Sequence, residues 1–416
     1  MKSFRVGLFL AYRQLRRTSI WTNALIVFVM MLTFLNLVVV AGLLVGLIQG
    51  SEEQYQKHYT GDVIVTALEN KPSIERTQDI IGSIKSTPGV RAFAVRYSES
   101  GNIKAEYKNS IKKDNEIDSS TGASFMGIDP KVEADMFQFD KFIVEGEYLK
   151  PGDFDQIIIG SLLLYRYTPI DSPGFTPLKS DVRPGSRVLV TLNGISREMT
   201  VKGILQTKVD EISSRVLMNQ AQFLQMSGRT TYDANQIAIS ILPGYTQTQV
   251  RDALRAKGFD QYARIQTQEE SLPRFLEQIK DTFGLLGNAI GSIGLAVASI
   301  TIFIVIFVNI VTRRKYIGIL KGIGVSSRSI EISYVIQSAF YALTGAGIGI
   351  FLVFAVLRPA FYAHPIDFPF SDGILAVTWA GTLGRALVLL VATIIAGYIP
   401  ARLIVRRNTL DSILGR

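Results

Sequence analysis

The sequence predicts a membrane α-helical protein with four transmembrane helices, one plus three, and an inserted α+β domain. Three observations lead to this fold class. Of the 416 residues, 48% are hydrophobic and the mean hydropathy is +0.25, which is too apolar for a soluble protein with an ordinary charged surface. Four apolar runs are long enough to cross a bilayer. A polar stretch at 52–281 separates the first run from the other three.

The apolar runs are Thr18–Ser51, Thr282–Thr312, Ile332–Leu357 and Gly373–Ala401, the last interrupted only by Arg385. Each exceeds the about 20 residues that a helix needs to span the hydrocarbon core. A cleavable signal peptide is the alternative for the first run, but its apolar core would be only about 7–15 residues long. The first run continues well past that length, so we expect a retained membrane anchor.

Lysine and arginine residues gather in three segments: the N-terminus, the loop after the second run, and the C-terminal tail. Because positive residues concentrate on the cytoplasmic side of membrane proteins, all three segments are expected in the cytoplasm. Four crossings with both termini inside satisfy this, so we expect a multi-pass protein of the cytoplasmic (inner) membrane. The residues are Lys2, Arg5, Arg13, Arg16, Arg17, Arg313, Arg314, Lys315, Lys321, Arg328, Arg402, Arg406, Arg407 and Arg416.

The expected boundaries follow from these runs. They are a cytoplasmic amphipathic segment at 1–19, transmembrane helices at 20–48, 282–312, 331–357 and 374–400, an extracytoplasmic α+β domain with a helical stalk at its end at 49–281, a cytoplasmic loop at 313–330, an outer loop at 358–373, and a cytoplasmic tail at 401–416.

The inserted stretch alternates short β-like runs with amphipathic helical patterns, which is typical of an α+β domain. Asn193-Gly194 between two apolar alternating runs predicts a β-hairpin, because both turn residues need a positive φ. The pattern that begins at Ser271 continues at helical spacing into the second apolar run and predicts a stalk. Expected strands are 62–68, 90–97, 187–192, 198–205 and 235–242, expected helices are 74–86 and 246–257, and 109–121 is expected to be a loop.

Residues for metal or catalytic chemistry are scarce. The chain has no cysteine and two histidines, His58 and His364, so a zinc site built from these residue types is excluded. The metalloprotease pattern HExxH and the esterase pattern GxSxG do not occur, and the Lys179-Ser180 pair lacks the glycines of a phosphate-binding loop. We therefore expect no enzyme activity, cofactor or metal in this chain. The net charge is +9, but the positive residues flank the apolar runs as in a membrane protein, so we expect no nucleic-acid binding.

Two features of the apolar runs are candidates for function. Arg385 is a charge inside the fourth run, where it is costly and a functional candidate, although its long side chain could instead reach the outer interface. Glycine pairs four residues apart allow close approach of helices, either within one chain or between subunits. The pairs are Gly42 and Gly46, Gly287 and Gly291, and Gly345 and Gly349.

Two motifs outside the apolar runs carry a family resemblance. Residues 313–326 read RRKYIGILKGIGVS, residues 396–402 read AGYIPAR, and LDSIL follows at 410–414. With the one-plus-three layout, these motifs resemble the MacB/FtsX/LolC-type permeases of ABC transporters, that is, FtsX-like permeases with a MacB-like periplasmic domain. The inserted domain, with its apolar runs at 142–146 and 157–160, is similar to that periplasmic domain in order of elements. One departure is Tyr316, where the family usually has glutamate.

The resemblance implies a permease subunit that binds no ATP itself and couples ATP hydrolysis by a separate ATPase subunit to extrusion by mechanotransmission. It implies a homodimer or heterodimer with a second permease subunit. It also implies substrates such as peptides, lipids, lipoproteins or drugs, and a periplasmic or outer-membrane partner. A regulator of a cell-wall hydrolase and a sensor or enzyme unrelated to ABC systems are the alternatives. The residues expected to couple to the ATPase are Arg313, Arg314, Tyr316, Ile317, Gly318, Leu320, Lys321 and Gly324.

The loop at 313–330 supports a docking role on its residues alone. Tyr316, Ile319, Leu320 and Ile323 form an apolar stripe between basic residues, which suits a groove in another protein. Contact with anionic membrane lipid is the competing interpretation.

Overall fold

The computed structural model describes residues 2–107, 120–169, 176–229, 231–272, 274–364, 366–368, 371–373 and 375–405. The chain divides into two compact units. The membrane unit comprises Met1–Gly50, Phe275–Phe368 and Asp372–Arg416, and the inserted domain comprises Ser51–Arg274 with Pro369–Ser371. The motif at 410–414, the basic residues Arg406, Arg407 and Arg416, and most of the predicted loop at 109–121 lie outside the described residues.

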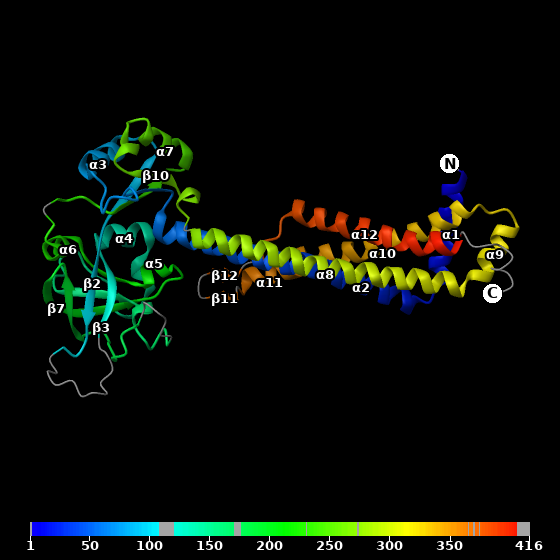
Figure 1. The fold of residues 1–416 in the computed structure, drawn as a ribbon, viewed down its shortest axis with the longest axis horizontal. Helices are drawn as coiled ribbons and strands as arrows, with labels where there is room; N and C mark the ends of the chain where they lie inside the picture. The colour runs from blue at the N-terminus through cyan, green and yellow to red at the C-terminus, as the bar shows by residue number, and fades with distance from the viewer. Residues whose placement is uncertain are drawn as a thin grey trace. The chain divides into compact units, whose positions relative to one another are not determined.

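Four helical segments are long and apolar enough to cross a membrane: Ile20–Thr60, Gln278–Thr312, Ser327–Ala363 and Trp379–Leu403. One precedes the inserted domain and three follow it, which confirms the predicted fold class. α8 is continuous from the predicted stalk into the second span (Figure 1). The helices are α1 (Lys2–Arg17), α2 (Ile20–Tyr55) with η1 (Gln56–Thr60), α8 (Arg274–Thr312), α9 (Arg314–Gly322), α10 (Ser327–Leu352) with η6 (Val353–Leu357) and α11 (Arg358–Ala363), and α12 (Trp379–Val405); the short strands β11 (Ile366–Phe368) and β12 (Ser371–Gly373) pair with each other.

Apolar side chains every four residues form the core of the membrane unit, because positions four apart lie on one face of a helix. α2 and α8 each contribute four such residues, and α10 and α12 add others. α1 packs along α10, where Gly7 lies against Ile332. The stripes are Ile26, Met30, Phe34 and Val38 on α2, and Ala298, Ile302, Ile306 and Ile310 on α8.

Each of the three predicted glycine pairs has at least one glycine that lies against another part of this chain, as Gly42 does against Leu375. Gly345 and Gly349 of α10 pack against Met30 and Phe34 of α2, and Gly291 of α8 packs against Leu37 of α2. These contacts agree with close approach of helices within one chain, and a role of the glycine pairs between subunits stays a prediction.

We expect Gly345→Ala to destabilise the membrane unit by about 1–3 kcal/mol, because inserting atoms into a packed contact is costly. A Cβ atom at position 345 would lie 2.5 Å from Cβ of Met30 and 3.0 Å from the backbone nitrogen of Met31. Gly347→Ala is the matched control, since no atom lies within 4 Å of its added Cβ and alanine is the better helix former. Thermal unfolding in mild detergent measures both; equal shifts would contradict this packing.

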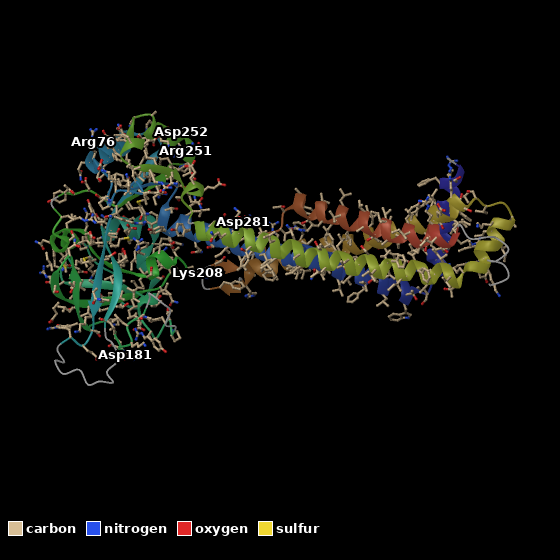
Figure 2. The ribbon with its side chains drawn as sticks, in the orientation of Figure 1. Arg76, Asp181, Lys208, Arg251, Asp252 and Asp281 are labelled. Atoms are coloured by element: carbon tan, nitrogen blue, oxygen red, sulfur yellow. The ribbon has the colours of Figure 1, made fainter. Side chains whose placement is uncertain are left out.

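The inserted domain contains a ferredoxin-like lobe, defined by a β-α-β-β-α-β chain order and an antiparallel sheet in the order β10-β1-β9-β2. α3 and α7 cover one face of this sheet, and their apolar residues join its core. Arg76 precedes α3, and Arg251 and Asp252 project from α7 (Figure 2). The elements are β1 (Val63–Thr66), α3 (Thr77–Ser86), β2 (Val90–Lys104), β9 (Gln236–Ile241), α7 (Gln247–Arg255) and β10 (Arg264–Thr267).

The second lobe is inserted between β2 and β9 and forms a closed barrel. β2 continues from the first sheet into the barrel, and β6 pairs with both β2 and β7, so the ring runs β2-β3-β8-β5-β7-β6. Closure leaves no open edge in the ring. The elements are β3 (Ser120–Ile128), α4 (Pro130–Phe137), β4 (Ile143–Gly146), β5 (Gln156–Gly160), β6 (Arg187–Leu192), β7 (Ile195–Leu205), α5 (Asp210–Ser213), β8 (Arg215–Asn219) and α6 (Gln220–Ser227), with short helices η2 (Phe139–Phe142), η3 (Ser161–Leu163), η4 (Phe259–Gln261) and η5 (Glu269–Ser271).

The predicted hairpin is present, with Asn193 at φ 47° and Gly194 at φ 81° between β6 and β7. The predicted helix at 246–257 begins with a capping box between Thr246 and Gln249. Other boundaries differ. β2 extends to Lys104 because its second half pairs within the barrel, and Ser120, expected in a loop, begins β3.

Candidate functional site

α9 divides the loop residues singled out by the sequence into an exposed set and a buried set. Tyr316, Ile319 and Ile323 are 70%, 53% and 73% exposed. They recur at positions i, i+3 and i+7, so they lie along one side of the helix. Lys315 beside them is also exposed. This spacing is typical of an amphipathic helix that enters a hydrophobic groove of another protein.

The buried set faces the membrane unit. Ile317 and Gly318 are buried, and Leu320 is half-buried against the apolar core of that unit. Leu320, grouped with the docking stripe from the sequence, therefore holds α9 in place, and its contact with a partner stays a prediction. Lys321 is half-buried, and the side chain of Arg314 lies outside the described residues.

Gly324 ends α9 with a φ of 91°, a conformation that side-chain-bearing residues rarely adopt. The N–H of Gly324 donates to the carbonyl of Lys321 (3.0 Å), and the N–H of Val325 donates to that of Leu320 (2.9 Å). These two bonds form a Schellman motif. Ser326 then caps α10 by accepting a hydrogen bond from the N–H of Ser329 (3.3 Å). The Gly-Val-Ser motif thus stops one helix and starts the next.

Arg313, immediately before α9, links this helix to α1. Its Nη2 donates to Oγ1 of Thr18 at 3.1 Å, and the Thr18 hydroxyl donates to the carbonyl of Gln14 at 2.8 Å. Nε2 of Gln337 on α10 donates to Oε1 of Gln14. One chain of hydrogen bonds therefore joins α9, α1 and α10.

A second pair of hydrogen bonds joins α10 to the start of α2. The Tyr341 hydroxyl donates to Oδ1 of Asn23 at 2.7 Å, and Nδ2 of Asn23 donates to the carbonyl of Leu15 at 3.0 Å. Hydrogen bonds between helices replace water contacts that are absent from the hydrocarbon region. A displacement of α9 would thus act on α1, α2 and α10 together.

Arg385 is half-buried in α12. Its Nη1 lies near Gly381, one turn toward the start of the helix. Within the described ranges it forms no hydrogen bond or ion pair. The side chain of Arg385 therefore extends toward the start of α12, which agrees with a charge that reaches the membrane interface. A functional role of Arg385 inside the membrane stays a prediction.

The chain enters the inserted domain through η1, whose side chains are held by the domain. Nδ1 of His58 lies 3.0 Å from the carbonyl oxygen of Phe137, and its ring packs edge-on against Phe142 at 4.7 Å. The carbonyl of Tyr59 accepts a hydrogen bond from Nη1 of Arg96 at 2.6 Å.

Arg96 itself belongs to a fully buried ion pair. Its Nε and Nη2 donate to the two carboxylate oxygens of Glu133 at 2.7 and 2.8 Å, and the two residues are 1% and 0% exposed. Burial alone would lower the pKa of Arg96, but the Glu133 charge and its hydrogen bonds raise that pKa above the usual range. Arg96 therefore stays protonated, and the pair anchors η1 to β2 and α4.

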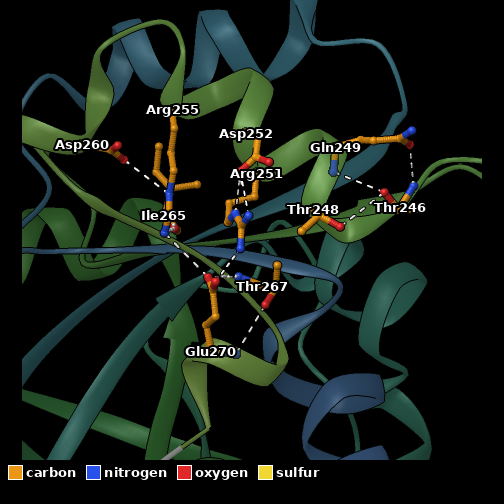
Figure 3. Close-up of polar contacts among 10 residues, drawn as sticks. All are labelled: Thr246, Thr248, Gln249, Arg251, Asp252, Arg255, Asp260, Ile265, Thr267 and Glu270. Atoms are coloured by element: carbon orange, nitrogen blue, oxygen red, sulfur yellow. Dashed lines mark hydrogen bonds and ion pairs between the residues drawn. The ribbon is translucent and has the colours of Figure 1, made fainter.

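The chain leaves the domain through η5, and Glu270 holds this exit (Figure 3). Its carboxylate accepts a hydrogen bond from the N–H of Thr267 (3.1 Å) while Oγ1 of Thr267 accepts from the N–H of Glu270 (3.3 Å), a reciprocal capping box. The same carboxylate pairs with Arg251 and lies 3.6 Å from Arg255, both on α7. Entry and exit also touch, because the N–H of Gln268 donates to the carbonyl of Asp62 at 3.1 Å.

The exposed apolar residues of α9 suit the binding of a partner, and the hydrogen bonds around Arg313 hold the helices together. Among the described residues, no group of three or more His, Asp or Glu side chains is placed to hold a metal ion. The hydrogen-bonded residues around Arg313 and the anchor at Arg96 were missed from sequence. Asn23 and Gln337 gave a weak signal, as amides inside apolar runs, whereas the Arg96–Glu133 pairing has none, since only the fold brings the two together.

Comparisons with known proteins agree with the motifs. Residues 288–409 match the family model described as the FtsX-like permease C-terminal domain. An uncharacterized ABC transporter permease of Methanocaldococcus jannaschii is 25% identical over 169 residues, which are 40% of this chain and 41% of that relative. The chain thus spans less than half the length of this curated relative.

Two crystal structures are similar at low sequence identity. The periplasmic region of MacB from Actinobacillus actinomycetemcomitans is 12% identical with a TM-score of 0.35, covering 52% of this chain and 92% of that one. The extracellular domain of the ABC-type transporter YknZ from Gram-positive bacteria is 14% identical with a TM-score of 0.33, covering 50% and 99%.

Proposed function

This chain belongs to the FtsX-like permease family, whose C-terminal domain it carries at residues 288–409, and on that premise we propose that it is the membrane-spanning subunit of an ABC transporter. ATP is bound and hydrolysed by a separate ATPase subunit. The chain carries the resulting movement outward by mechanotransmission and so extrudes a substrate on the outer side. The termini and α9 lie in the cytoplasm, and the inserted domain lies outside.

The observation that carries this proposal is the exposed stripe of α9. Tyr316, Ile319 and Ile323 would enter a groove of the ATPase, with Lys315 at its rim. The helix is held from behind by Ile317 and Leu320, so a push on the stripe would move α9 as a body. Tyr316 replaces the ion pair of a glutamate with an apolar and hydrogen-bonding contact.

The movement would follow the chain itself together with hydrogen bonds and ion pairs between its elements. Arg313 connects α9 to α1 and α10, and α9 follows α8 directly in the chain. α2 and α8 lead to η1 and η5, where the Arg96–Glu133 pair and Glu270 hold the entry and exit of the inserted domain. A second permease subunit, homologous or identical, and a periplasmic or outer-membrane partner complete the proposed assembly in the lipid bilayer.

Affinity purification of the tagged chain from its native membrane in mild detergent tests the proposal. We expect an ATPase subunit to co-purify with the chain and to hydrolyse ATP in the complex. A matched preparation of a different tagged membrane protein controls for adventitious ATPases. Recovery of the chain without any nucleotide-binding subunit would contradict the proposed function.

A further inference from the structure

The ferredoxin-like sheet has a second face that α3 and α7 do not cover, and a cavity of about 370 Å³ lies over it. Strand residues alternate between the two faces. On β1, Val63 and Val65 face the helices, whereas Ile64 and Thr66 line the cavity. Tyr59 of η1 also lines it. All lining residues belong to the inserted domain, and the volume falls within the about 300–1,000 Å³ typical of small-molecule sites.

Most charges around this cavity are already compensated. Arg96 pairs with Glu133, Arg264 pairs with Glu69 at 3.0 Å, and Glu270 pairs with arginines of α7.

Arg215 differs from these residues, since among the described residues its guanidinium forms no ion pair with a carboxylate. Its contacts are neutral: Nη2 donates to the Tyr59 hydroxyl at 3.2 Å, and Nη1 lies 3.4 Å from Sδ of Met126. The Glu211 carboxylate, which accepts a hydrogen bond from Tyr55 in the cavity wall, acts on Arg215 only electrostatically and forms no ion pair with it.

A second lining group also lacks a partner. Gln236 on β9 is 7% exposed, and within the described part of the chain its Nε2 has no hydrogen-bond acceptor. A buried donor without an acceptor costs about 1–3 kcal/mol. In the part of the chain that the structure describes, Arg215 has no ion-pair partner, and the Gln236 amide has no hydrogen-bond acceptor. An acceptor group of a bound ligand would satisfy both.

We propose that this cavity binds a small monovalent carboxylate, with Arg215 as the anion anchor and Gln236 as a second donor. A single guanidinium without an ion-pair partner matches one negative charge, which favours a carboxylate over a phosphate dianion. Arginine is also suited to bind a carboxylate through two parallel N–H donors. The carboxylate belongs either to a small organic acid or to the free C-terminus of a peptide. Carboxylate binding here does not rest on the proposed transport role, although Arg96 and Glu270 of the cavity wall also hold the entry and exit of the inserted domain.

Calorimetric titration of the purified full-length chain in lipid nanodiscs tests the site with four probes: acetate, N-acetyl-trialanine with a free C-terminus, the C-terminal amide of that peptide, and inorganic phosphate. We expect at least one of the two carboxylates to bind, and the peptide amide to bind at least tenfold more weakly than the peptide acid if the acid binds. Binding of acetate alone identifies an organic-acid site, and preference for the peptide acid identifies a C-terminus site. Tighter binding of phosphate, or no binding of either carboxylate, overturns the proposal.

Two variants connect binding to the cavity. Arg215→Gln should weaken carboxylate binding at least tenfold, and Gln236→Met, which keeps the side-chain size, should weaken it severalfold. Arg187→Gln is the control and should bind as wild type, because Arg187 pairs with Glu198 on the exposed surface of the barrel. Gln236→Met keeps the test decisive if Arg215→Gln fails to fold. Unchanged affinity in the folded variants would overturn the site.

Discussion

Replacing Glu133 by leucine should destabilise the inserted domain by about 3–5 kcal/mol, because Arg96 would remain as a buried and unpaired charge. The pair is 1% and 0% exposed, so water cannot compensate the guanidinium. For a domain of this size, about 2–4 °C per kcal/mol converts the loss to a fall of roughly 6–20 °C in the unfolding temperature. Thermal unfolding of the full-length chain in mild detergent measures it.

The double variant Arg96→Met with Glu133→Leu separates the cost of the charge from the cost of packing. It should recover much of the stability, since apolar residues often replace a buried ion pair at little cost. Glu198→Gln is the surface control. Its partner Arg187 is 64% exposed, and such pairs contribute about 1 kcal/mol or less. If the double variant were as unstable as Glu133→Leu, the uncompensated charge would not be the cause.

The Arg96–Glu133 pair also illustrates what a single sequence could not provide. The four spans could be predicted because hydropathy is a local property, and the hairpin because Asn193-Gly194 is a local turn signal. The ferredoxin-like order could not. β1 pairs with β9 and β10, which lie more than 160 positions away in the sequence. Alternation of apolar residues indicates that a strand has one buried face, but it does not identify the strands that pair with it.

The candidate docking site was predictable in position and less so in detail. The sequence placed Tyr316, Ile319, Leu320 and Ile323 in one stripe, because all four are apolar and helically spaced. In the structure, Leu320 turns to the membrane unit while the other three are exposed. A helix as short as α9 has apolar residues on two sides, and only its packing in the folded membrane unit decides which side is buried.

This division identifies Ile319 as the residue whose substitution tests docking most directly. We expect Ile319→Asp to abolish co-purification of an ATPase and to lower coupled ATP hydrolysis at least tenfold. An apolar anchor at the centre of an interface commonly contributes about 2 kcal/mol or more, and an unpaired carboxylate in its groove adds a desolvation cost. Affinity purification with an ATPase assay measures both quantities.

Folding should be unaffected, because Ile319 is 53% exposed and its side chain is not part of the buried core. Leu320→Asp would confuse docking with packing, since Leu320 contacts that core. Ile195→Asp is the matched control, a comparably exposed isoleucine (45%) beside the β6–β7 turn of the inserted domain, where the change should leave ATPase binding intact. If the ATPase still co-purified with Ile319→Asp, the exposed stripe of α9 would not be part of the interface, and contact with membrane lipid would remain as its role.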